Sequence, residues 1–258
     1  MNPSPVLLVE HLSKSYGGVH ALRELSFSVH AGEKVAVIGP NGAGKTTLFN
    51  VLNGQLAADS GTVVFDSAPI AGLPPQLIAR RGVGRTFQVP ATFASMTVKE
   101  NVQLALAARR NGLRSPLAGP RALHAREAIT VLERTGIASL AERSCTTLAY
   151  GDLKRVELAI ALACRPRLLL MDEPTAGLAP AERARLMELV VELVATDKVA
   201  LLFTEHDMDV VFAHADRVLV LNRGRLISAG PPAAVRTDPH VRRVYLGPPT
   251  QPGTLPDA

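Results

Sequence analysis

A glycine-rich segment with the sequence GPNGAGKT, at residues 39–46, constrains the fold more than any other part of this chain. The segment fits the pattern G-x-x-x-x-G-K-[ST]. The run before it, KVAVIG, is typical of a strand buried in a parallel sheet, and residues 45–53 predict a helix that ends at Gly54. A strand, a tight loop and a helix N-terminus in this order place several backbone N–H groups around an anion. The sequence therefore predicts an α/β domain that binds the phosphates of a nucleotide.

Each residue type in the loop has a chemical reason. The glycines let the backbone curl toward phosphate oxygens, Lys45 reaches the β- and γ-phosphates, and Thr46 supplies a hydroxyl ligand to Mg²⁺. The residues expected to contact the nucleotide are Gly39, Pro40, Asn41, Gly42, Ala43, Gly44, Lys45, Thr46 and Thr47. The alternative is a glycine-rich turn whose lysine faces solvent, but the strand and helix on either side favour phosphate binding. By itself the loop does not separate a kinase, a small GTPase, a helicase or a transport motor.

A second apolar run, RLLLMDEP at residues 167–174, ends in two acidic residues. At the carboxyl end of a strand beside the phosphate loop, Asp172 can hold the Mg²⁺ shell. Glu173 points elsewhere and is free to polarise a water in line with the γ-phosphate. The alternative is an Asp-Glu-Pro turn with both acids solvated, and the presence of the glycine loop favours the catalytic pair.

Composition narrows the class of protein. Hydrophobic residues make up 47% and charged residues 20%, which is typical of a globular chain, and no apolar run approaches the roughly 18 residues of a membrane-spanning helix. The start of the chain lacks a basic leader and there are two cysteines, so we expect a cytosolic protein. The net charge is +5, but aromatic residues make up 4% and tryptophan is absent, which leaves little for stacking on bases. A solvated basic surface is the preferred interpretation, and nucleic acid or an anionic membrane surface is the alternative.

The pattern of strands and helices places the two motifs in one core. Residues 5–17 and 20–33 predict an antiparallel pair of strands that opens the chain, and further strands are expected at 61–67 and 83–88. From residue 167 strands and helices alternate again. The expected fold class is α/β, with a mainly parallel sheet, helices on both faces and an N-terminal antiparallel β region.

The periodicity of apolar residues becomes helical over residues 89–150. TVKENVQLALAARR and LHAREAITVLERTG have helical periodicity, and a polar connector with Pro and Gly separates them at residues 111–122. We therefore expect one domain over the whole chain, with a helical subdomain inserted into a core. The expected bounds are 1–258 for the domain, 1–88 and 151–247 for the core, 89–150 for the helical subdomain and 248–258 for a flexible tail.

With these motifs in order, the chain resembles the nucleotide-binding subunit of an ATP-binding cassette (ABC) transporter over about residues 6 to 247. RTFQ ends in Gln88 and matches the glutamine loop, LAYGDLKRVELAIAL matches the signature segment, AGLAPAE matches the dimer-contact loop, and FTEHDM supplies His206 as the switch histidine. Tyr16 matches the aromatic residue that stacks on adenine. The resemblance implies Mg-ATP as the ligand, with Gln88, Glu173 and His206 in catalysis and Thr46, Gln88 and Asp172 around the metal.

Each of these residues has a simpler interpretation. Tyr16 could close a strand by packing, and Gln88 could be an exposed residue at a strand end. His206 could be structural or solvated, but its position after the apolar run VALLFT places it at the same sheet edge as Asp172. That placement favours a contact with the γ-phosphate.

The signature segment departs from the common family pattern Leu-Ser-Gly-Gly-Gln. Ala149 replaces the serine, Tyr150 replaces the first glycine and Asp152 replaces the glutamine. The resemblance implies that Leu148, Ala149, Tyr150 and Gly151, with a helix expected to start near Leu153, meet the γ-phosphate held by an opposite subunit. Ala179 is a further departure, because the dimer-contact loop usually carries a polar residue there.

Several segments resemble those of the ATP-binding subunits that serve importers of branched-chain and other hydrophobic amino acids. They are MTVKENV, the Leu-Ala-Tyr-Gly signature, TEHDMDVV and the ending VRRVYLG. This resemblance implies an ATP-hydrolysing motor subunit, paired with itself or with a similar subunit. Its expected partners are integral membrane permeases and, indirectly, a solute-binding receptor, on the cytoplasmic face of the membrane. Two alternatives stay open: an ATP-dependent dimerisation switch with weak turnover, and an ABC-type ATPase acting on nucleic acid or ribosomes, although no nucleic-acid partner is expected.

Overall fold

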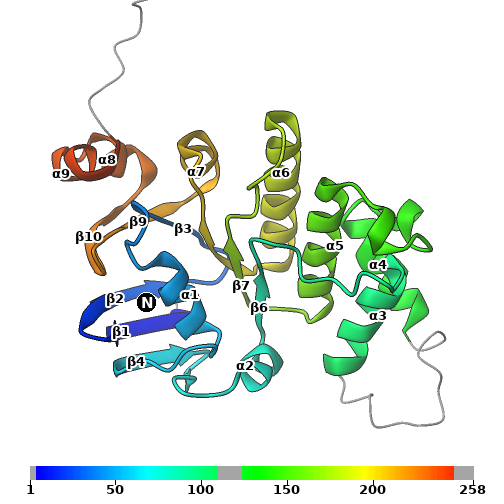
Figure 1. The fold of residues 1–258 in the computed structure, drawn as a ribbon, viewed down its shortest axis with the longest axis horizontal. Coiled ribbons are helices and arrows are strands. Elements are labelled where there is room, and N and C mark those ends of the chain that lie inside the picture. Colours follow the sequence, from blue (N-terminus) through cyan, green and yellow to red (C-terminus); the bar gives the residue numbers. More distant parts are fainter. Residues whose placement is uncertain (1–3, 110–123, 247–258) are drawn as a thin grey trace, which may run out of the picture.

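Two β-sheets form the centre of the molecule, in a computed structural model that describes residues 4–109 and 124–246 (Figure 1). Within those residues the first sheet has the order β2-β1-β4-β5 and is antiparallel. Its strands are β1 (Leu7–Tyr16), β2 (Val19–Val29), β4 (Ser60–Phe65) and β5 (Ala68–Pro69). The expected antiparallel opening of the chain is confirmed.

The second sheet has the order β10-β9-β3-β8-β7-β6 among the described residues. Its strands are β3 (Lys34–Ile38), β6 (Val83–Thr86), β7 (Leu168–Asp172), β8 (Ala200–Thr204), β9 (Arg217–Asn222) and β10 (Arg225–Gly230). The pairs from β9 to β6 are parallel, and only β10 runs antiparallel to its neighbour. Every residue of β7 and β8 is buried, which explains why both strands read as continuous apolar runs. The expected mainly parallel sheet is confirmed.

Helices cover both faces of the parallel sheet. On one face, α1 (Lys45–Leu52) buries Leu48, Phe49 and Leu52 in an apolar cluster shared with the antiparallel sheet. On the other face, α6 (Pro180–Asp197) buries Met187 and Val190 in a second cluster. Shorter helices follow: α2 (Pro75–Arg81), α7 (Met208–His214), α8 (Pro232–Thr237), α9 (Pro239–Val241) and a π-helical turn at Arg242–Leu246.

A third apolar cluster lies in the helical region, which Figure 1 shows at one end of the molecule. It joins α3 (Val98–Arg109), α4 (Ala125–Arg134) and α5 (Tyr150–Ala163), with 3-10 turns at Ala138–Leu140 and Cys145–Thr147. The predicted connector at 111–122 and the predicted tail at 248–258 lie outside the described residues.

Two local expectations differ from the structure. The signature helix α5 begins at Tyr150 rather than near Leu153, because extended Ala149 serves as its N-cap and the helical turn starts directly after it. Helix α2 and the short C-terminal helices have too few residues to show a helical period, and the sequence did not predict them. Across the described residues, the structure has no helix with both the length and the apolar character needed to span a bilayer.

Candidate active site

The glycine loop is held so tightly that side chains are excluded at two positions. Gly44 has φ +107° and is the N-cap of α1, and a Cβ there would lie 2.4 Å from the Ala21 carbonyl oxygen. A Cβ on Gly39 would lie 2.1 Å from the carbonyl oxygen of Leu221. The backbone at these two glycines therefore packs directly against the backbone of neighbouring segments. Helix α1 begins directly after the loop, as the sequence predicts.

Lys45 is a buried cation that lacks a full counter-charge in the described residues. Its side chain is 8% exposed, and Nζ donates to the carbonyl oxygens of Gly39 at 2.6 Å and Pro40 at 3.3 Å. Burial lowers the pKa of Lys45, and the carboxylates of Glu173 and Asp172 act in the opposite direction. A buried ammonium held by neutral carbonyls is electrostatically suited to an incoming phosphate. The hydroxyl-bearing Thr46 beside it is exposed.

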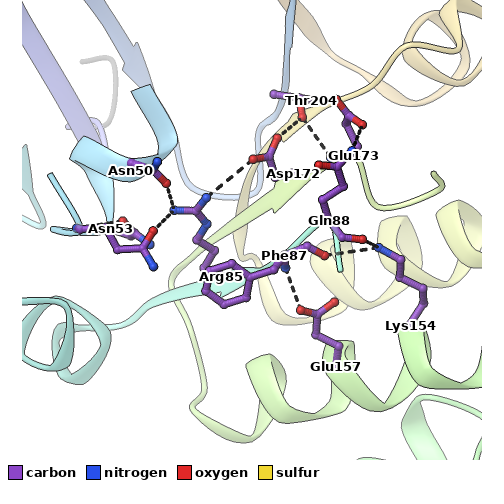
Figure 2. A network of polar contacts seen from close by, with 11 residues as sticks. Asn50, Asn53, Arg85, Phe87, Gln88, Lys154, Glu157, Asp172, Glu173 and Thr204 are labelled. Atoms are coloured by element: carbon purple, nitrogen blue, oxygen red, sulfur yellow. Dashed lines mark hydrogen bonds and ion pairs between the residues drawn. The ribbon is translucent and has the colours of Figure 1, made fainter. Parts of the chain in front are cut away.

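Asp172 lies at the end of β7, level with Thr204 of β8 in the sheet register. The Thr204 hydroxyl donates to Asp172 Oδ1 at 2.7 Å, and the Arg85 guanidinium lies 3.6 Å from Oδ2 (Figure 2). Asp172 itself is 8% exposed. The strand register and these two partners fix its carboxylate at the sheet edge.

Glu173 is in contact with two of the other residues expected at the site. Its backbone has φ +48°, which is uncommon for a residue other than glycine. Its N–H donates to Thr204 Oγ1 at 3.0 Å. Gln88 Nε2 donates to Glu173 Oε2 at 2.8 Å, and His206 Nε2 lies 2.7 Å from Oε1. Three residues from three separate segments of the chain, all expected at the site, are thus in direct contact (Figure 2 shows Gln88 and Glu173).

Comparison with known proteins identifies the family. The ABC transporter family pattern matches residues 22–176, and a pattern described as branched-chain amino acid ATP-binding cassette transporter matches residues 225–247. The high-affinity branched-chain amino acid transport ATP-binding protein LivG of Salmonella typhimurium is 41% identical over 94% of this chain and 98% of its own length. BraF of Pseudomonas aeruginosa, which has the same description, is 40% identical with the same coverage.

This chain belongs to the ABC transporter family. A nucleotide-free ATP-binding cassette from an ABC transporter has a TM-score of 0.83 and 32% identity, covering 95% of this chain and all of that one. A structure described as the ADP conformation of such a cassette has the same score, identity and coverage. The chain is therefore a nucleotide-binding ABC ATPase, and as the ATP-binding subunit of a transporter it acts together with membrane permeases.

Tyr16 and the signature segment lie on other elements of the chain than the phosphate loop and its helix. Tyr16 ends β1 and is 46% exposed, with Lys14 Nζ 5.8 Å from the centre of its ring. Figure 1 places β6 and β7 between α1 and the signature helix α5. Leu148 packs against the helical cluster, while Ala149 is exposed. Beside Gly151 lies a cavity of about 230 Å³ whose lining includes Asp152 and Glu182.

Two of the three residues expected to hold Mg²⁺, Thr46 and Asp172, carry oxygen atoms of the kind that this ion takes. Among the described residues no group of three or more His, Cys, Asp and Glu is positioned to hold a metal. Mg²⁺ usually takes one or two carboxylates and completes its shell with water and phosphate oxygens, so a dedicated cluster is not required. The fixed carboxylate of Asp172 and the exposed hydroxyl of Thr46 supply oxygen ligands of that kind.

Sequence reasoning missed four polar residues of this cassette site. Thr204 and Arg85 hold Asp172, and Lys154 and Glu157 hold the backbone of the glutamine loop. The available signal was a polar or charged residue within a segment that is otherwise buried, because such a residue needs a partner.

Proposed function

We propose that this chain is the ATP-hydrolysing motor subunit of an importer for branched-chain or other hydrophobic amino acids. The observation that carries the catalytic part is the position of Glu173, which meets Gln88 and His206 directly after Asp172. A carboxylate with two polar partners at the edge of a phosphate site is suited to orient and deprotonate a water.

The site residues have distinct proposed roles. Tyr16 stacks on adenine, residues 39–47 hold the phosphates, and His206 holds the γ-phosphate while Glu173 activates the water. Thr46, Gln88 and Asp172 are the proposed holders of Mg²⁺, which when bound neutralises charge on the β- and γ-phosphates. Lys45 already has a charge with no full counter-ion, which supports its assignment to the phosphates.

Assembly follows from the separation of two motifs. Figure 1 shows β6 and β7 between α1, which follows the phosphate loop, and the signature helix α5. This separation supports a second copy or a similar subunit that brings its signature segment, residues 148–151, to the γ-phosphate. Two nucleotides are then enclosed between paired subunits, and hydrolysis lets the subunits part. We place this pair against membrane permeases at the cytoplasmic face of the membrane, with a solute-binding receptor as an indirect partner.

The proposed cargo rests on the relatives. Both LivG and BraF are described as serving branched-chain amino acid transport, and residues 225–247 match a pattern with the same description. These residues include β10, which pairs with β9, and the C-terminal helices. Val244, in the last turn of this segment, lines a cavity of about 560 Å³ together with Pro40, Asn41 and Gly42 of the phosphate loop.

Two assays test the proposal. Purified protein should hydrolyse ATP in the presence of Mg²⁺, and a host strain lacking this gene should lose uptake of labelled leucine, isoleucine and valine, with uptake restored by the wild-type gene. Normal uptake of these amino acids in the deletion strain would refute the cargo. Firm ATP binding with negligible turnover, both alone and with the permeases, would favour the dimerisation switch.

A further inference from the structure

Helix α5 carries two buried charged residues whose partners are backbone atoms of a neighbouring loop. Lys154 is 4% exposed and Glu157 is 3% exposed. A buried charge is costly unless it is hydrogen-bonded, so these side chains must have partners. Those partners lie in residues 87–91, the segment that leaves β6 and contains Gln88.

The two residues hold both kinds of backbone group in that segment. Glu157 Oε1 accepts from the N–H of Phe87 at 2.7 Å and of Ala91 at 3.3 Å. Lys154 Nζ donates to the carbonyl oxygens of Gln88 at 2.7 Å and Phe87 at 3.3 Å (Figure 2). Burial lowers the pKa of Lys154 and raises that of Glu157, and the opposite charge of each residue counters the shift of the other. Residues 87–91 form no helix or strand, so their backbone groups have no regular hydrogen bonds of that kind. Side chains of α5 supply hydrogen-bond partners instead.

Tyr150 extends the same contact toward a third segment. Its hydroxyl donates to the Gln88 carbonyl oxygen at 3.2 Å, and Lys154 Nζ lies 5.6 Å from the centre of its ring. A Cβ on Gly177 would lie 3.0 Å from Tyr150 Cε1, so the ring packs on the loop that follows Glu173. The tyrosine that replaces a glycine in the signature segment thus contacts both the glutamine loop and the dimer-contact loop.

We propose that Tyr150, Lys154 and Glu157 form a clamp that positions Gln88 against Glu173 and makes the glutamine loop move together with the signature helix. The carbonyl of Gln88 is held by α5, and the side-chain amide of the same residue donates to Glu173. A displacement of α5 therefore moves the amide that contacts the proposed base. The three members are positioning residues that act through Gln88, and this role rests on the proposed function of Glu173.

The clamp gives the altered signature segment a structural purpose. Tyr150 supplies the hydroxyl and the ring that a glycine lacks. It is the first residue of α5 and is 40% exposed. Contiguous contacts between residues far apart in the chain then couple the signature helix to the glutamine loop and the glutamine loop to the proposed base.

A double-mutant cycle on kcat tests the clamp. Lys154→Met removes the ammonium but keeps an unbranched side chain, and kcat for ATP hydrolysis should fall by about 10-fold while KM changes by less than about 2-fold. In a chain that already carries Gln88→Ala, Lys154→Met should cause no further loss of kcat, because both substitutions act on the same contact between Gln88 and Glu173. Lys154→Arg restores donors and should recover most of the rate.

Lys99→Met is the matched control. Lys99 lies on α3 in the same helical region and pairs at the surface with Glu142. Its replacement should leave kcat within about 2-fold of the wild-type value, since surface ion pairs contribute little. An equal 10-fold loss from Lys154→Met with and without Gln88→Ala would overturn the proposal, because the lysine would then act independently of Gln88.

Hydrogen exchange tests the clamp without any need for turnover. The amides of Phe87 and Ala91 should exchange at least about 10-fold faster in Glu157→Met, which removes the acceptor oxygen, than in the wild type, and at the wild-type rate in Lys99→Met. Unchanged exchange in Glu157→Met would overturn the clamp even if ATP hydrolysis is normal. If the wild type hydrolyses no ATP, the proposed function fails and exchange alone decides the clamp. If Lys154→Met does not fold, Tyr150→Phe takes its place in the cycle with the same expected and contrary outcomes.

Discussion

His206 Nε2 lies 2.7 Å from Glu173 Oε1, which joins the ends of β7 and β8 through one side-chain contact. A carboxylate can only accept, so the imidazole donates from Nε2 in the tautomer that carries a hydrogen there. The contact places a histidine and a carboxylate from neighbouring parallel strands at one point of the sheet edge.

We expect His206→Ala to lower kcat for ATP hydrolysis by about 100- to 1,000-fold, the usual effect of removing one preorganised transition-state contact. ATP affinity should change by less than about 10-fold, because the phosphate loop is untouched. Steady-state hydrolysis and equilibrium binding of ATP measure the two effects. A variant that hydrolyses ATP at the wild-type rate would remove His206 from the proposed site.

Thr204→Val tests the residue that connects the two carboxylates. Thr204 is fully buried, its hydroxyl donates to Asp172 and it accepts from the Glu173 N–H. Valine keeps the shape but leaves that N–H without its acceptor, which should lower the free energy of unfolding by about 1–3 kcal/mol and lower kcat as well. Thr204→Ser is the control, because serine keeps the hydroxyl and should keep most of the activity. Wild-type stability and turnover of Thr204→Val in urea unfolding and ATPase assays would contradict the assignment.

Tyr16→Ala should weaken ATP binding, because the exposed ring at the end of β1 is free to stack on adenine. Loss of base stacking is worth about 1–3 kcal/mol, or roughly 5- to 150-fold in the dissociation constant. Tyr16→Phe keeps the ring and should bind as the wild type does. Equal ATP affinity of Tyr16→Ala and wild type, measured by calorimetry, would show that the ring packs without contacting the base.

The two thiols should be unreactive in the folded protein. Burial raises the pKa of both Cys145 and Cys164, so the reactive thiolate form is depleted at pH 8. Alkylation by iodoacetamide at pH 8 should be slow until denaturant is added, and it is followed by mass spectrometry. Rapid native labelling of either cysteine would contradict the raised pKa of its thiol.

The position of the candidate catalytic residues could be predicted because parallel strands end together. The apolar runs of β7 and β8 end at the same side of the sheet, which places Asp172 and His206 near each other. The bounds of α6 also follow from the sequence, since Pro180 is suited to the first turn and the apolar period is clear.

The clamp could not be predicted from the sequence. Lys154 and Glu157 lie three residues apart on a helix, a spacing that usually indicates a solvated ion pair, and their partners are 66 to 70 residues earlier in the chain. The early start of α5 has a similar cause, because Ala149 caps the helix through its extended backbone without a side-chain hydrogen bond. Tertiary contacts decide both features.

The rate of ATP hydrolysis by Glu173→Gln is the most direct test of the central claim, that the carboxylate held between Gln88 and His206 activates the attacking water. Glutamine keeps the size of the side chain and its capacity for hydrogen bonds but cannot take a proton. The predicted result is a fall in turnover of at least about 100-fold, with ATP still bound and the paired form accumulating in its presence. Turnover within about 2-fold of the wild-type rate would contradict the account.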